Sequence, residues 1–175
     1  MKRLILTTAI VGLLGFTSLN AQTKDPAMGG PKLGIGAEFA FPTGSTADGV
    51  DFGYGGSLQY QHPIANKLNV TGSAGFINFK SKEILGTTFN AGFIPVKAGL
   101  RYFLAENIFV NGEVGASFST EDGGSTGFAY SPGIGIEFPV ADGGTIELGG
   151  RYEGWKYDGG TTKFVGLRLA YNFGL

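Results

Sequence analysis

The chain has 175 residues, enough for one domain, and its formal net charge of −1 argues against a nucleic-acid partner, which would require a basic patch. Glycine is over-used, with 32 residues, and charged residues make up only 15% of the chain, compared with about 25% in ordinary soluble domains. The absence of cysteine excludes disulfides, thiolate metal sites, cysteine nucleophiles and a lipoprotein anchor.

The first 21 residues have the features of an export signal. Lys2 and Arg3 precede an apolar run at residues 4–16, and Ala21 before Gln22 offers a cleavage site. As a helix this run would span roughly 20 Å, short of the ~30 Å of a bilayer core. We therefore expect residues 1–21 to be a cleaved signal peptide and residues 22–30 a short periplasmic tail.

From residue 31 to the end, apolar and polar residues alternate with the period of a β-strand. Eight strands are predicted, at residues 32–42, 52–62, 68–79, 89–104, 108–119, 126–138, 145–157 and 162–175. Three of the breaks (43–51, 80–88 and 120–125) are rich in glycine, serine, threonine and acids, whereas the others are short. Bacterial barrels place short turns in the periplasm and longer loops outside, so we expect these three breaks to be external.

The charged residues of the strands all fall on the polar face of the alternation. In the last strand, for example, Arg168 shares a face with Gly166, while Leu167 lies on the opposite face. The nine predicted lumen charges are Glu38, Lys97, Arg101, Glu113, Glu137, Glu147, Arg151, Glu153 and Arg168. By contrast, every aspartate is predicted in the tail, a loop or a turn.

The face with glycine, arginine and glutamate suits the narrow interior of an eight-stranded barrel. The wide apolar face must then contact something apolar outside, and a closed barrel is the only sheet that lipid tolerates. The sequence therefore predicts an all-β fold, an eight-stranded antiparallel up-and-down transmembrane β-barrel over residues 31–175. The alternative is a soluble periplasmic barrel that binds an apolar ligand, which would leave Arg101, Arg151 and Arg168 outside.

Two further features bear on the barrel. Aromatic residues cluster near both strand ends, as in the girdles of membrane barrels: Tyr60, Tyr102, Phe138, Tyr171 and Phe173 at the turns, and Phe41, Phe52, Tyr54, Phe118, Phe128 and Tyr130 at the loops. Pro95 and Pro132 lie inside predicted strands, and the apolar phase slips next to Pro95. A β-bulge is expected there.

With this topology the chain resembles small eight-stranded outer-membrane barrels, namely the OmpA transmembrane domain and OmpX-like proteins, especially the glycine-rich porin-family barrels of Bacteroidota. The most specific part of the resemblance is residues 165–175, which look like the C-terminal signal read by the barrel-assembly machinery. The resemblance assigns that signal to Leu169, Tyr171, Phe173 and Leu175, although such signals usually end in Phe and this one ends in Leu. It also implies residence in the outer membrane, with membrane lipid and the assembly machinery as partners. A monomer is expected, and no external partner is indicated.

The predicted barrel is compatible with three functions. The first is a structural or interaction barrel whose lumen charges form a plug, with Glu113 paired to Lys97 and Arg101, and Glu153 near Arg168. The second is a narrow porin-like channel. The third is a lipid-modifying enzyme, but His62 is the only histidine and is predicted at the periplasmic end without an orienting partner. We expect no enzyme activity, no cofactor and no metal site in the acidic loops.

Overall fold

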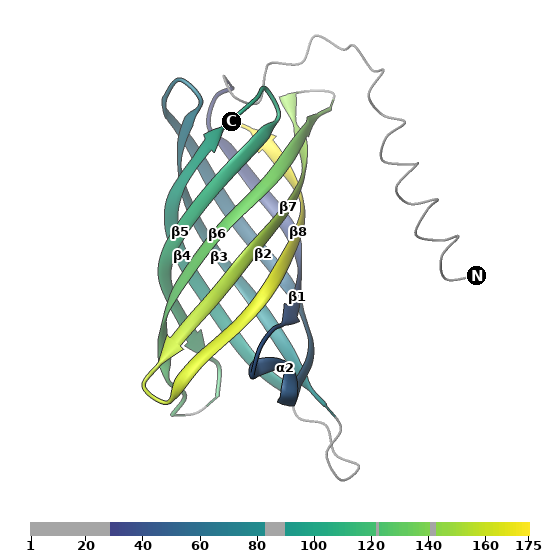
Figure 1. Ribbon diagram of the computed structural model, residues 1–175. Helices are drawn as coiled ribbons and strands as arrows, with labels where there is room; N and C mark the ends of the chain where they lie inside the picture. The colour runs from purple at the N-terminus through teal and green to yellow at the C-terminus, as the bar shows by residue number, and fades with distance from the viewer. Residues whose placement is uncertain (1–28, 83–89, 122, 141–142) are drawn as a thin grey trace, which may run out of the picture.

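A computed structural model describes residues 29–82, 90–121, 123–140 and 143–175. It is a closed barrel in which each strand pairs antiparallel with the next and the last strand pairs with the first (Figure 1). The strands are β1 (Lys32–Pro42), β2 (Val50–Ala65), β3 (Leu68–Ser81), β4 (Asn90–Phe103), β5 (Ile108–Ser119), β6 (Thr126–Pro139), β7 (Thr145–Tyr157) and β8 (Gly160–Gly174). The predicted fold class and strand number are confirmed.

The two ends of the barrel differ. At one end, called here the turn end, lie the C-terminus and the connections β2–β3, β4–β5 and β6–β7 (Figure 1). At the other, the loop end, lie a one-turn helix, α2 (Thr46–Gly49), and the β3–β4, β5–β6 and β7–β8 connections. The predicted signal peptide, most of the tail and most of the 80–88 loop lie outside the described residues. No helix among the described residues is long and apolar enough to cross a membrane.

The apolar side chains point outward. Leu167, Leu169 and Tyr171 of β8 are 40%, 49% and 37% exposed, whereas Arg168 between them is 6% exposed. A one-residue change of register would have reversed this arrangement, because alternate side chains lie on opposite faces. The predicted orientation is therefore confirmed, and the soluble barrel with an apolar interior is excluded.

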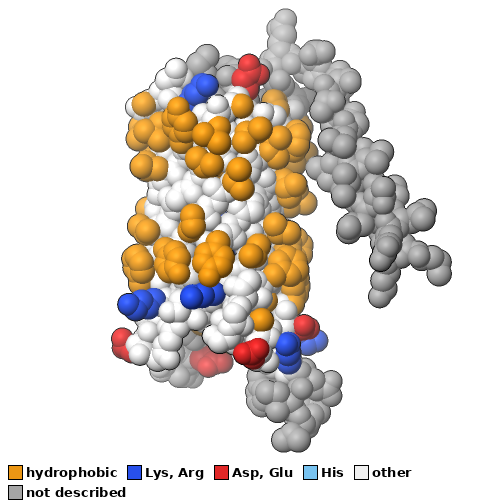
Figure 2. Space-filling view, viewed as in Figure 1, with side chains coloured by type: hydrophobic (Ala, Val, Ile, Leu, Met, Phe, Trp, Pro, Cys, Tyr) orange, Lys and Arg blue, Asp and Glu red, His pale blue; other side chains and the backbone are white. Residues whose placement is uncertain are grey.

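The outer wall has a layered composition. Figure 2 shows hydrophobic side chains in two belts, one toward each end of the barrel, while charged side chains on this face lie beyond the belts. Most of the predicted girdle aromatics are exposed on the wall, among them Tyr54, Tyr60, Tyr102, Phe118 and Phe128. Phe52, Tyr130 and Phe138 are half-buried. The wall therefore has the apolar band with aromatic borders that lipid-facing barrels show.

The predicted β-bulge at Pro95 is wrong. Pairing of β4 with β3 is interrupted at Ile94 and Pro95, but it resumes in the same register, and the register with β5 does not change. Pairing between β6 and β7 is interrupted in the same way at Pro132. The register shifts lie instead at both ends of β2, so that this strand begins at Val50 and includes Asp51, which was predicted in a loop.

An apolar layer inside the barrel explains the phase slip near Pro95. Phe93 packs into the lumen against Phe79 and Trp155, with ring centroids 6.0 and 5.1 Å apart. This loop-end layer consists of Ala40, Ile77, Phe79, Ala129, Trp155 and Phe164, with Val50, Phe93 and Tyr157 packed against it. Near the turn end a smaller pair, Phe103 and Phe109, is also buried. The lumen is therefore polar only in part, whereas the alternation of the sequence predicts a lumen lined by polar and small residues.

Candidate functional site: the charged lumen

The structure places all nine predicted lumen charges inside the barrel. Eight of them are buried, with at most 7% exposed, and Arg151 is nearly so, with 12% of its side chain exposed. It adds a tenth, Lys32, which is 4% exposed at the first position of β1. Among the residues that the structure describes, the lumen thus holds five basic and five acidic side chains, and their formal charges cancel.

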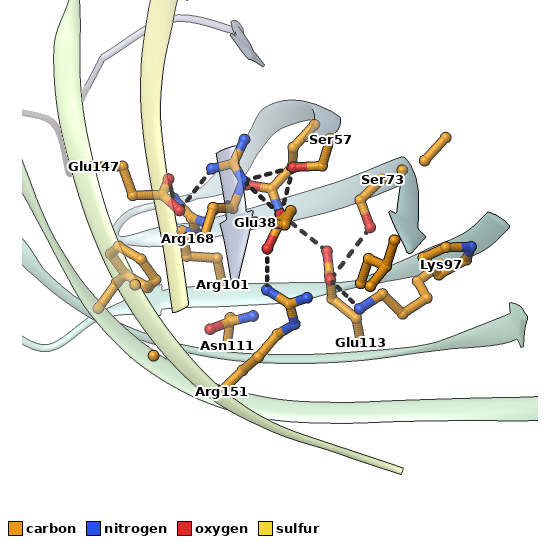
Figure 3. Close-up of a pocket in the computed structure, with 18 residues that line it drawn as sticks. Glu38, Ser57, Ser73, Lys97, Arg101, Asn111, Glu113, Glu147, Arg151 and Arg168 are labelled. Carbon is orange, nitrogen blue, oxygen red and sulfur yellow. Dashed lines mark hydrogen bonds and ion pairs between the residues drawn. The ribbon is translucent and has the colours of Figure 1, made fainter. Parts of the chain in front are cut away.

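These ten residues form one unbroken series in which basic and acidic side chains alternate. Nine ion pairs join them in the order Lys32, Glu137, Arg101, Glu147, Arg168, Glu38, Arg151, Glu153, Lys97, Glu113. The N–O distances are 2.6 Å for Lys32–Glu137 and 2.8 Å for Arg101–Glu147, and the longest, Lys97–Glu113, is 3.7 Å. Figure 3 shows the central part of the series, from Glu147 through Arg168 and Glu38 to Arg151.

The partners of two arginines differ from those that the sequence predicted. Arg101 pairs with Glu137 and Glu147 rather than with Glu113, and Arg168 pairs with Glu147 and Glu38 rather than with Glu153. Only the Lys97–Glu113 pair joins the neighbouring strands for which it was predicted. Arg101 of β4 reaches across the narrow lumen to β6 and β7. Arg168 stays with its neighbouring strands, where Glu38 lies directly opposite it on β1 and Glu147 lies diagonal to it on β7.

Neutral side chains complete the hydrogen bonding of the carboxylates. Glu113, which has a single basic partner, accepts hydrogen bonds from Gln59, Thr71 and Ser73, at 3.1 to 3.3 Å. Trp155 of the loop-end layer donates its indole N–H to Glu153 at 2.7 Å. Such additional donors are what a buried ion pair needs to offset the cost of removing both charges from water.

Inward-facing glycines make room for the guanidinium groups. A Cβ atom at Gly166 would lie 2.9 Å from Cζ of Arg151, and one at Gly36 would lie 3.0 Å from Nε of Arg168. Arg101 instead lies 3.7 Å from the ring centroid of Phe109, within the range of a cation–π contact. Part of the glycine content therefore has a local cause, since Arg151 and Arg168 each lie where a neighbouring strand has a glycine.

Little space remains between the charged groups. A cavity of about 40 Å³ is lined by Arg101, Glu113, Glu147, Arg151 and Arg168, among others. At about 10–15 Å³ for each water, this holds roughly three or four molecules, and Arg101 Nε and Arg168 Nη2, which have no partner among the described residues, are available to them. A single file across a ~30 Å bilayer core would need roughly ten waters.

The remaining candidate residues lie outside the lumen. His62 is exposed on β2, where its ring stacks on Tyr60 with centroids 6.1 Å apart. No group of three potential metal ligands occurs among the described residues. The four residues assigned to the assembly signal, Leu169, Tyr171, Phe173 and Leu175, all project outward at the end of the chain.

The chain is similar in sequence or structure to known outer-membrane barrels. The sequence matches the family model described as outer membrane protein beta-barrel domain over residues 9–173, whereas no curated protein matches it. The barrel is similar to Ail, the attachment invasion locus protein of Yersinia pestis, with 22% identity and a TM-score of 0.56 over 83% of this chain and 100% of that one. It is also similar to Neisserial surface protein A, with 15% identity and a TM-score of 0.54 over 81% of this chain and 94% of that one.

At these identities the solved structures share only the fold, but the family model spans nearly the whole chain and all eight strands. The chain belongs to the outer membrane protein beta-barrel domain family.

Proposed function

We propose that this protein is a non-conducting outer-membrane barrel with a structural or interaction role, exerted through the loop end. The observation that carries the proposal is the unbroken series of nine ion pairs in the lumen, closed toward the loop end by the buried aromatic layer. A barrel filled in this way offers a rigid support for surface loops rather than a path for solutes.

We expect the purified barrel to show no steady conductance in planar lipid bilayers, because buried ion pairs and the loop-end layer fill the lumen and the cavity among the charges holds only a few waters. A known porin inserted in the same membranes serves as the positive control. Stable nanosiemens channels from correctly folded barrels, identified by their heat-modifiable migration on gels, would overturn the proposal in favour of a narrow porin-like channel.

Similarity to Ail supports the interaction form of the proposal. That protein is an attachment and invasion locus product, and one of its structures contains a heparin analogue, sucrose octasulfate. Adhesion is therefore the interaction to test first, by comparing the binding of cells with and without the barrel to host-cell surfaces. Equal binding by both strains would leave the structural role and reject adhesion.

The orientation in the membrane is part of the same proposal. We propose export through the signal peptide at residues 1–21 and insertion by the barrel-assembly machinery, with the loop end outside the cell. In that orientation a reagent outside the cell can reach lysines at the loop end but not lysines at the turn end. We expect a membrane-impermeant amine reagent applied to whole cells to label Lys82 at the loop end and not Lys67 in the β2–β3 turn. Labelling of Lys67 alone would show the reverse orientation, and lysed cells provide the control in which both react.

A further inference from the structure

Basic side chains gather at one border of the apolar wall. Lys80, Lys82, Lys156 and Lys163 are exposed near the loop end, and on the face seen in Figure 2 basic side chains lie next to the lower belt, with acidic ones mostly farther out. Lysine at such a border keeps its alkyl chain on apolar surface and its ammonium group at the level of the lipid headgroups.

Two of these lysines form a pair on the β7–β8 hairpin. Lys156 lies opposite Thr161 and Lys163 lies opposite Gly154, so the two lysines are diagonal neighbours. Both point outward, because Trp155 and Phe164 beside them are buried in the lumen. Diagonal neighbours are about 7–8 Å apart, a spacing at which two ammonium groups can bind one phosphate between them. Neither lysine forms an ion pair with a residue that the structure describes.

An apolar surface continues from this pair toward the middle of the wall. Phe128 lies opposite Lys156 and is 55% exposed, and Tyr152 and Val165 lie opposite each other and are also exposed. Between them Gly154 has no side chain, and the ring of Tyr130 occupies the space where its Cβ would project. The pair therefore stands at the end of a strip of aromatic and aliphatic side chains along which acyl chains can lie.

We propose that Lys156 and Lys163 bind the phosphate of an anionic membrane lipid in the leaflet next to the loop end, with its acyl chains along Phe128, Tyr152 and Val165. Two observations carry this assignment: the pair has no acidic partner among the described residues, and it adjoins the apolar belt, where lipid headgroups meet the wall. The site is independent of the lumen and of any partner of the loops.

The test is native mass spectrometry of the detergent-solubilised barrel titrated with diphosphoryl lipid A. The wild-type barrel should carry the lipid, and the double variant K156Q/K163Q should bind it about 30-fold more weakly, which corresponds to about 1 kcal/mol for each lysine near a membrane surface. Heat-modifiable migration confirms that the variant folds, as expected for exposed polar replacements.

Two comparisons make the result specific. The charge-matched variant K80Q/K82Q, at the same end of the barrel, should bind as the wild type does; an equal loss would show general electrostatic attraction and overturn the site. Inorganic phosphate at the concentration of the lipid should not displace it. Displacement by inorganic phosphate would mean that the pair binds free phosphate, and undiminished binding by K156Q/K163Q would also reject the proposal.

Discussion

Replacement of Arg101 by methionine is expected to lower the free energy of unfolding by about 3–5 kcal/mol, the cost of leaving a buried charge without its partner. Arg101 is 1% exposed and joins two glutamates of the ion-pair series, 2.6 Å from Glu137 and 2.8 Å from Glu147. Its second guanidinium nitrogen donates to Gln59 at 2.8 Å. Methionine fills similar space but leaves the two carboxylates next to each other, since Glu137 and Glu147 lie opposite each other on β6 and β7, each with one basic partner instead of two.

Urea unfolding of the barrel in lipid vesicles, followed by its heat-modifiable migration, measures this loss. R101K should lose less, because the charge is kept while the two-pronged geometry is not. K67M, in the β2–β3 turn and away from the lumen charges, is the control and should change stability by less than about 0.5 kcal/mol. If R101M proves as stable as K67M, the lumen charges do not hold the barrel together.

A double-mutant cycle separates the ion pair from the packing of the arginine. E147Q alone should destabilise the barrel, but in combination with R101M it removes one of the two carboxylates left with a single basic partner. The combined loss should therefore be smaller than the sum of the two single losses, with a coupling energy of about 1–3 kcal/mol. Strict additivity would show that Arg101 contributes through its contact with Phe109 rather than through Glu147.

The strand alternation made most of the barrel predictable from the sequence. A closed sheet in lipid requires one apolar and one polar face, and a shift of one residue exchanges the two faces. Glu38, Arg101 and Arg168 were therefore assigned to the lumen solely because they fall on the polar face of the alternation, and the structure places them there. Strand ends were less precise, as at Val50 and Ala65, where bulges extend β2 beyond its regular part.

The contacts across the lumen were not predictable in this way. The alternation tells which side chains enter the lumen, but the ion-pair partners depend on the diameter and shear of the barrel. Arg101 was therefore paired with Glu113 of the neighbouring strand, when its partners are Glu137 and Glu147 on β6 and β7. The loop-end layer was missed because apolar residues on the lumen face contradict the alternation. The change of apolar phase after Phe93 was consequently interpreted as a bulge. Phe93 in fact lies on the same lumen-facing side of β4 as Lys97 and Arg101, with no change of register between them.

Substitution of alanine for Gly115 is expected to cost about 3 kcal/mol or more, at the upper end of what overpacking costs. Gly115 faces the lumen from β5, directly opposite Lys97 of β4. A Cβ atom there would lie 2.0 Å from the carbonyl oxygen of Val96 and 2.7 Å from the Cα of Lys97. Because both contacts are to backbone, no side-chain rotation relieves them, and β4 must move away from β5.

Gly112 provides the matched control, since it lies three residues earlier in the same strand and faces outward, with nothing within 4 Å of the position of its Cβ. G112A should change the free energy of unfolding by less than about 0.5 kcal/mol, while G115A should also weaken the contacts of Lys97 with Glu113 and Glu153. Both variants are measured by urea unfolding in vesicles. Equal stabilities would mean that the close approach of β4 and β5 at Gly115 is not a feature of the folded barrel, whereas a loss confined to G115A ties the glycine content of the chain to the packing of its lumen.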